Sequence, residues 1–139
     1  MAETTRREFQ QLARIRFNDA RVLMRDGNVE GAYYLTGLAV ECAVKACIAK
    51  NTKRHDFPPN QNTVRDMYTH DLVKLRGAAK LQTALDTETN RSNSFKKNWD
   101  VVKAWNVESR YATKGLNVRD LYAAVAGRGG VMQWLRQRW

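Results

Sequence analysis

The sequence predicts an all-α protein: an antiparallel four-helix up-down bundle core with additional short C-terminal helices. Two observations support this prediction. Proline and glycine are scarce among the 139 residues, with two and eight copies, which is typical of helical rather than β-rich chains. Apolar residues also recur at three- and four-residue steps over most of the chain, the period of an amphipathic helix. The length fits a single domain, residues 1–139, which can bury a core without disulfides or metals.

The first two helices are expected at residues 4–26 and 29–50. The first is amphipathic, and the second is apolar almost all the way round, which places it at the centre of the bundle. Gly27 lies in the short link between them, so the two helices should pack antiparallel. The second helix is nearly long enough to span a membrane, but Glu41 and Lys45 lie near its middle. We therefore expect a core helix and no membrane contact.

Breaks in the periodicity divide the rest of the chain. Residues 51–63 contain both prolines and should form a loop. Residues 87–94 are a polar turn cluster, and GRGG at 127–130 is a second break. The remaining helices are expected over residues 70–81 with a continuation toward 87, after a cap at Ser94, after a cap at Asn117, and over 131–139.

The charge balance favours a polyanionic partner. Lys and Arg outnumber Asp and Glu by 24 to 14, a formal charge of +10, which attracts RNA, DNA or anionic membranes. A generally basic, solvated surface is the alternative. The two cysteines, Cys42 and Cys47, fall in the central apolar helix and should be buried free thiols. Without a disulfide framework or a secretory leader, a cytoplasmic protein is expected.

Three segments in order resemble the HEPN superfamily. The first is GAYYLTGLAVECAVKACI, in which residues 32–46 match the family pattern A-x-x-A-x-x-A-x-E-x-x-x-K-A. THDLVKL follows, with the His-Asp-Leu-x-x-Leu turn at 70–75, and then ESRYA, with the pair Arg110 and Tyr111. The order and spacing of these pieces, over most of the chain, identify the chain as similar to small stand-alone HEPN proteins.

The resemblance implies a homodimer with a cleft at its interface and a role in RNA cleavage, RNA binding, or defence and toxin-antitoxin systems. Arg65 and His70 match the spacing Arg, four residues, His of nuclease-active relatives. There the His is a general acid or base and the Arg stabilises charge on the phosphorane, without a metal. In this chain Arg65 precedes the third helix rather than opening the last, and Leu72 replaces the tyrosine that some toxin members carry. The alternative is that His70 or Asp71 caps a helix.

Two further groups are candidates for nucleic-acid or phosphate contacts. Lys53, Arg54 and His55 lie in the proline loop, where they suit phosphate groups, although a solvated charge run is the alternative. Arg110 and Tyr111 combine a guanidinium fork with a stackable ring, which suits unpaired RNA bases. A structural tyrosine hydrogen bond is the alternative for this second pair.

Glu41 and Lys45 are one helical turn apart, with the acid N-terminal, which favours an ion pair. We expect this to be a structural polar pair in the central helix rather than part of a cleft. At the C-terminus, Trp134 and Trp139 alternate with arginines, a pattern that could stack on bases or dock a partner. Trp134 is expected to pack on the bundle.

Two functions from different classes follow from these observations. The first is a metal-independent endoribonuclease with Arg65 and His70 in a composite dimer site. The second is a non-catalytic module that binds RNA, nucleotide, or a nucleotidyltransferase-like or antitoxin protein partner. A structural homodimer with an exposed aromatic end is a third possibility. No cofactor and no metal site are expected, because no ligand spacing recurs.

Overall fold

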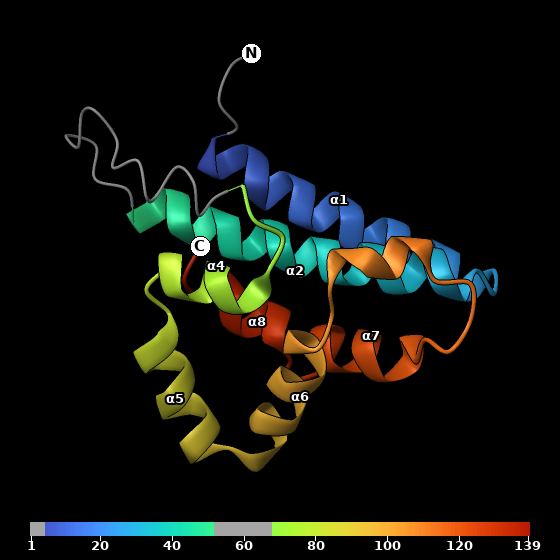
Figure 1. The fold of residues 1–139 in the computed structure, drawn as a ribbon. Helices are drawn as coiled ribbons and strands as arrows, with labels where there is room; N and C mark the ends of the chain where they lie inside the picture. The colour runs from blue at the N-terminus through green and yellow to red at the C-terminus, as the bar shows by residue number, and fades with distance from the viewer. Residues whose placement is uncertain (1–4, 52–67) are drawn as a thin grey trace.

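The protein is all-α, as predicted. The computed structural model describes residues 5–51 and 68–139, and all regular secondary structure within these two ranges is helical (Figure 1). The helices in chain order are α1 (Arg6–Arg25), α2 (Val29–Asn51), α4 (Leu72–Ala78), α5 (Gln82–Arg91), α6 (Asn93–Lys103), the 3₁₀ helix η1 (Val107–Tyr111), α7 (Val118–Ala126) and α8 (Val131–Arg136).

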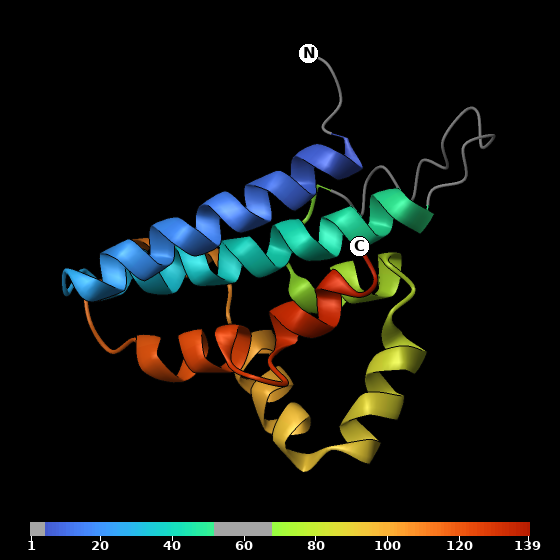
Figure 2. The same cartoon turned by 180° about the vertical axis from the view of Figure 1, so that it is seen from behind.

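Helix α1 begins at a capping box. The Thr5 hydroxyl accepts a hydrogen bond from the Glu8 amide (3.2 Å), and the Glu8 carboxylate accepts one from the Thr5 amide (2.6 Å). These reciprocal bonds satisfy amides that a helix start leaves unpaired. At the other end Gly27 has a φ of +79°, a left-handed conformation that costs glycine little. The chain reverses there, and α1 runs antiparallel beside α2 in both ribbon views (Figures 1 and 2).

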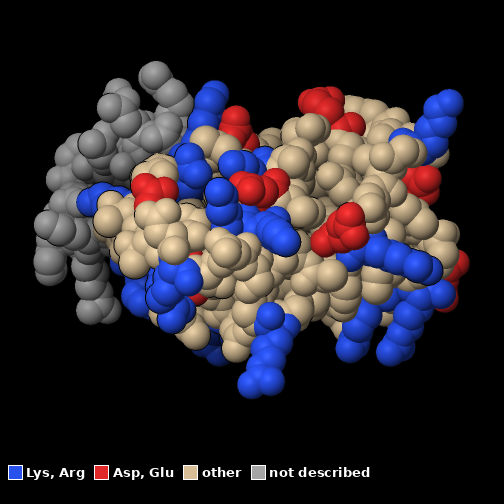
Figure 3. All heavy atoms as spheres, turned by 90° about the horizontal axis from the view of Figure 1, so that it is seen from below, with Lys and Arg blue, Asp and Glu red and all other residues tan. Residues whose placement is uncertain are grey.

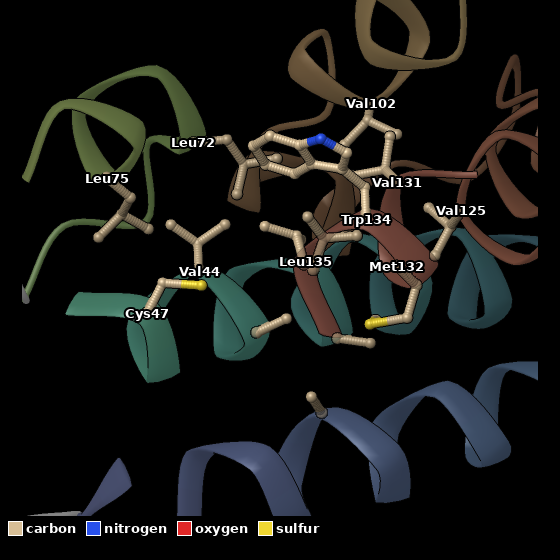
Figure 4. Packing of buried hydrophobic residues seen from close by; sticks show 14 of the residues in the cluster. Val44, Cys47, Leu72, Leu75, Val102, Val125, Val131, Met132, Trp134 and Leu135 are labelled. Atoms are coloured by element: carbon tan, nitrogen blue, oxygen red, sulfur yellow. The ribbon is translucent and has the colours of Figure 1, made fainter. Parts of the chain in front are cut away.

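Helix α2 is the centre of the fold. Every residue from 39 to 48 is buried, and α2 contacts α1, α4, η1, α7 and α8. Figure 4 shows Val44 and Cys47 of α2 in one core with Leu75 of α4 and Leu135 of α8. Each fully buried leucine stabilises the fold by about 2 kcal/mol. By length and composition α2 could also cross a membrane, but 72% of its most apolar stretch is buried inside the protein.

The four-helix up-down core is not confirmed. Helices α1 and α2 form a long antiparallel pair, with 20 and 23 residues, but α6, the longest of the other described helices, has only 11. The short helices α4, η1, α7 and α8 pack on α2, whereas α5 and α6 form a V that points away from it (Figure 1). The fold is therefore a helical hairpin with a layer of short helices against its second member.

The predicted turn at 87–94 is mostly wrong, because α5 continues to Arg91. Its last turn is stabilised by Arg91, whose guanidinium lies 2.8 Å from the Glu88 carboxylate, a pair that supports a helix whose surface is polar. Buried Leu85 anchors the same helix. The break is confined to Ser92, whose hydroxyl accepts from the Phe95 amide (3.2 Å) and caps α6 in place of the predicted Ser94.

Local capping predictions at two other helices agree with the structure. Asp71 caps α4, and the Asn117 side chain accepts a hydrogen bond from the Asp120 amide (3.1 Å) at the start of α7. The 3₁₀ helix η1 was not predicted. The two caps could be predicted because each depends on residues two or three positions apart. A 3₁₀ helix of five residues could not, because it lacks the apolar periodicity that marks a longer helix.

Both cysteines are buried free thiols, as expected. Cys42 is 7% exposed and Cys47 is fully buried. Burial raises the pKa of each thiol to about 11, so both are protonated at neutral pH. They act as small apolar side chains of the core rather than as nucleophiles.

One close contact fixes the distance between α2 and the chain that follows α6. The indole ring of Trp105, 2% exposed, lies directly against the backbone of Gly37. A Cβ atom built on Gly37 would fall far inside van der Waals contact with three atoms of that ring. Glycine is therefore required here for close approach, and Trp105 also stacks on Tyr34 of α2 with ring centroids 6.2 Å apart.

We expect Gly37→Ala to lower the free energy of unfolding by about 2 kcal/mol or more, because the added methyl group displaces a buried indole. Urea unfolding followed by circular dichroism measures this. Gly77→Ala in α4 is the matched control, since a Cβ there meets nothing within 4 Å, and it should leave stability unchanged or raise it by up to about 1 kcal/mol. Equal effects of the two substitutions would contradict the packing of Trp105 on Gly37.

Candidate functional site

His70 lies in the short segment that leads into α4, and local hydrogen bonds fix its backbone. The Asp71 carboxylate accepts from the amides of Val73 (2.9 Å) and Lys74 (3.2 Å). The Asp71 amide in turn donates to the Thr69 hydroxyl (3.2 Å). This N-cap arrangement holds the residue before it in a defined direction, so that the His70 side chain reaches across to α2.

The His70 ring is hydrogen-bonded to a buried carboxylate. Its Nδ1 lies 2.8 Å from Oε1 of Glu41, and the other carboxylate oxygen of Glu41 lies 3.5 Å from Nζ of Lys45. The Glu41 side chain is 3% exposed, whereas that of His70 is 48% exposed. Because a carboxylate only accepts, Nδ1 is the donor, and the neutral ring presents Nε2 as its free base.

Glu41 thus holds two neighbours at once. The expected Glu41–Lys45 ion pair is present, but no pattern in the sequence indicated that His70 also contacts Glu41. A buried carboxylate needs such compensation, because removing it from water is unfavourable by several kcal/mol. The same bond orients the imidazole, as carboxylates do for catalytic and metal-binding histidines.

An open cleft of about 790 Å³ lies beside His70. One wall is formed by the segment before α4 and its first turn, and the other by the chain between α6 and η1, including Lys103, Trp105 and Asn106. Both segments cross the same face of α2, in front of it in Figure 1. The cleft therefore combines an exposed imidazole with ammonium, amide and apolar surfaces.

Arg110 and Tyr111 lie on η1, next to the cleft wall. The Arg110 guanidinium is 4.8 Å from the centre of the Tyr111 ring, and Tyr111 is 69% exposed. Tyr111, with a further contribution from Tyr34, raises the pKa of Arg110 above its ordinary value. Since Tyr34 also stacks on Trp105, this exposed pair is connected to the cleft through two packed aromatic rings.

The structure does not support the prediction that the C-terminal tryptophans could stack on bases or dock a partner. Trp134 is 7% and Trp139 is 8% exposed, and Trp134 packs on Phe95 with ring centroids 5.6 Å apart. Trp134 therefore packs on the bundle as expected, and neither ring can stack on a nucleic-acid base. The third function, an exposed aromatic end that recruits another protein, loses its basis.

Four of the predicted site residues, Lys53, Arg54, His55 and Arg65, lie outside the described residues. The structure therefore brings together His70, Glu41 and Lys45, and places Arg110 and Tyr111 near the same face. Over residues 5–51 and 68–139, no three His, Cys, Asp or Glu side chains gather so that they could hold a metal ion.

The sequence did not indicate Trp105, Tyr34 or the contact between His70 and Glu41. His70 and Glu41 are 29 residues apart, and no local spacing rule connects them. A polar residue inside an otherwise apolar helix was the one available signal, because a buried carboxylate needs a partner. That signal predicted Lys45 but could not select His70.

Comparisons with protein-family models, with curated proteins and with solved structures found no match to this chain. The resemblance to HEPN proteins therefore stays a prediction from the sequence.

We expect Glu41→Gln to lower the free energy of unfolding by about 3 kcal/mol, because it leaves the buried Lys45 ammonium without a counter-charge. Glu41→Gln/Lys45→Met should recover most of that loss in the same urea titration. His70→Ala should cost only about 1 kcal/mol, since the ring is half exposed and one hydrogen bond is lost. If Glu41→Gln were as mild as a surface substitution, the carboxylate would not be an anchor of the fold.

Proposed function

We propose that this protein is RNA-directed, of the HEPN type, and that it cleaves RNA without a metal at His70. The observation that supports the proposal is the Glu41–His70 contact of 2.8 Å, in which a buried carboxylate orients a half-exposed imidazole at an open cleft. An oriented, solvent-accessible imidazole is the usual general acid or base at neutral pH.

The reaction that fits this group is transesterification of the RNA backbone. A base removes the proton from a ribose 2′-hydroxyl, whose oxygen attacks the adjacent phosphorus. The bond from phosphorus to the 5′-oxygen breaks, and an acid protonates the leaving oxygen. The products are a 2′,3′-cyclic phosphate and a free 5′-hydroxyl. Nε2 of His70 can serve either step, and in the proposed homodimer a second copy supplies the other.

Arg110 and Tyr111 would hold the substrate beside the cleft. A guanidinium fork binds phosphate oxygens, and a 69% exposed tyrosine ring offers a face to an unpaired base. The net charge of +10 favours polyanions in general. In the HEPN resemblance, stabilisation of the phosphorane charge is assigned to Arg65.

A second candidate function is a non-catalytic module that binds RNA, a nucleotide, or a nucleotidyltransferase-like or antitoxin partner protein. The same Glu41–His70 bond favours it, because a histidine that compensates a buried carboxylate has a structural role without any chemistry. In that case the cleft and the basic surface would bind, and no bond would be cut.

Incubation of end-labelled total RNA with the protein in EDTA distinguishes the two functions. We expect the wild type to produce fragments ending in 2′,3′-cyclic phosphate, and His70→Ala to lose about 100-fold or more of the rate, the usual size of a general acid–base contribution. Asn90→Ala, a substitution at an exposed residue of α5, controls for contaminating nucleases and should cleave as the wild type does. Folding and oligomeric state are measured in parallel.

Equal cleavage by His70→Ala and the wild type would exclude His70 as the acid or base. Absence of cleavage by the folded wild type would favour the binding module instead.

A further inference from the structure

Three arginines lie over the two buried tryptophans at the end of the chain. The guanidinium carbon of Arg138 is 3.8 Å from the centre of the Trp134 ring. Arg14 of α1 and Arg136 of α8 lie over Trp139, at 5.0 Å and 6.0 Å. An arginine held over an aromatic face has its planar group restricted in orientation, and Arg138 is held further by a hydrogen bond that it donates to the Trp134 carbonyl oxygen (3.0 Å).

These three arginines have no carboxylate partner among the described residues. Other arginines of the protein do have such partners, since Arg16 pairs with Asp19 at 3.1 Å and Arg91 with Glu88 at 2.8 Å. Figure 3 shows one face of the protein, on which basic and acidic side chains are interspersed. From residue 121 to residue 139 the chain carries no acidic residue at all. The arginines over the tryptophans therefore form a local excess of unpaired positive charge.

A small hollow extends this surface toward α7. It has a volume of about 320 Å³ and lies between α1, α7 and α8. Arg128 and Arg136 line it together with Phe17 and Met132. Arg136 belongs to both the hollow and the Trp139 stack, so the positive charge is continuous from the turn before α8 to the end of the chain.

We propose that this surface, formed by Arg14, Arg128, Arg136 and Arg138, binds the phosphate backbone of single-stranded RNA. The inference deepens the proposed function and rests on it. Guanidinium groups that are already oriented lose little rotational freedom when they bind phosphate, and they match its oxygens in pairs. A membrane surface is a poorer fit, because the tryptophans that would insert into it are buried.

This surface is separate from the His70 cleft, because no residue that lines the cleft also lines the hollow between α1, α7 and α8. Helix α8 and the end of the chain lie in front in Figure 2, whereas the segment before α4 and η1 lie in front in Figure 1. Binding through the arginines is therefore separate from cleavage at His70. His70→Ala should keep its RNA affinity, while arginine variants should lose it.

Fluorescence anisotropy with a labelled oligouridylate, titrated at several salt concentrations, tests the proposal. We expect Arg14→Gln/Arg136→Gln to weaken binding about tenfold at low salt. The slope of log affinity against log salt should fall by about 1.4, because each phosphate contact on a single strand contributes about 0.7. Arg16→Gln/Arg91→Gln removes the same charge from cations that already have partners, and it should bind nearly as the wild type does.

Arg14→Lys/Arg136→Lys keeps the charge but removes the stacked planar groups, and we expect a loss of affinity of a few fold. If this variant bound like the wild type, the oriented guanidinium groups would not be the binding element. If both glutamine pairs weakened binding equally, net charge alone would account for it. If the wild type bound the RNA and Arg14→Gln/Arg136→Gln bound it with the same affinity, this inference would be overturned while the proposed function stayed intact. Lack of any binding by the wild type would contradict both.

Discussion

The buried carboxylate of Glu41 is the constraint on which the candidate site depends. It lies inside the most buried helix of the fold, where an uncompensated charge would be unfavourable by several kcal/mol. Lys45, one turn later, and His70, 29 residues later, both meet it. The compensation therefore joins the start of α4 to the middle of α2, and it places the one described histidine at the surface with its orientation already fixed.

The second constraint is steric and acts on the opposite wall of the cleft. Trp105 can lie against α2 only because residue 37 has no side chain, and the chain from Lys103 to η1 follows that contact. One wall of the cleft is thus held against α2 by a polar contact and the other by an apolar contact. Arg110 is connected to the same packing through Tyr34, and Tyr111 lies against Arg110. A site built in this way is oriented before any ligand binds, which is what binding and catalysis both require.

The sequence predicted features that depend on neighbouring residues. The bounds of α1 and α2 came within two residues because their apolar patterns are long, and the caps at Asp71 and Asn117 involve bonds of two or three residues. Features that depend on contacts between residues far apart in the sequence were either not predicted or predicted wrongly. Helix α5 continues through a polar stretch, the Glu41–His70 contact has no local signal, and Trp139 is covered by Arg14, which lies 125 positions earlier. Helical periodicity also could not show that the later helices are too short for a four-helix bundle.

We propose that two separate surfaces of this chain bind polyanions: a cleft with an oriented imidazole, and arginines held on tryptophan rings. The first of these depends on Glu41, which fixes the orientation of His70. Long-range ¹H–¹⁵N correlation spectra of the histidine rings test this directly, with His55→Gln used for assignment, since the chain has two histidines. We expect neutral His70 to carry its proton on Nδ1 in the wild type and to lose that preference in Glu41→Gln. A ring protonated on Nε2, or one that does not respond to Glu41→Gln, would contradict it.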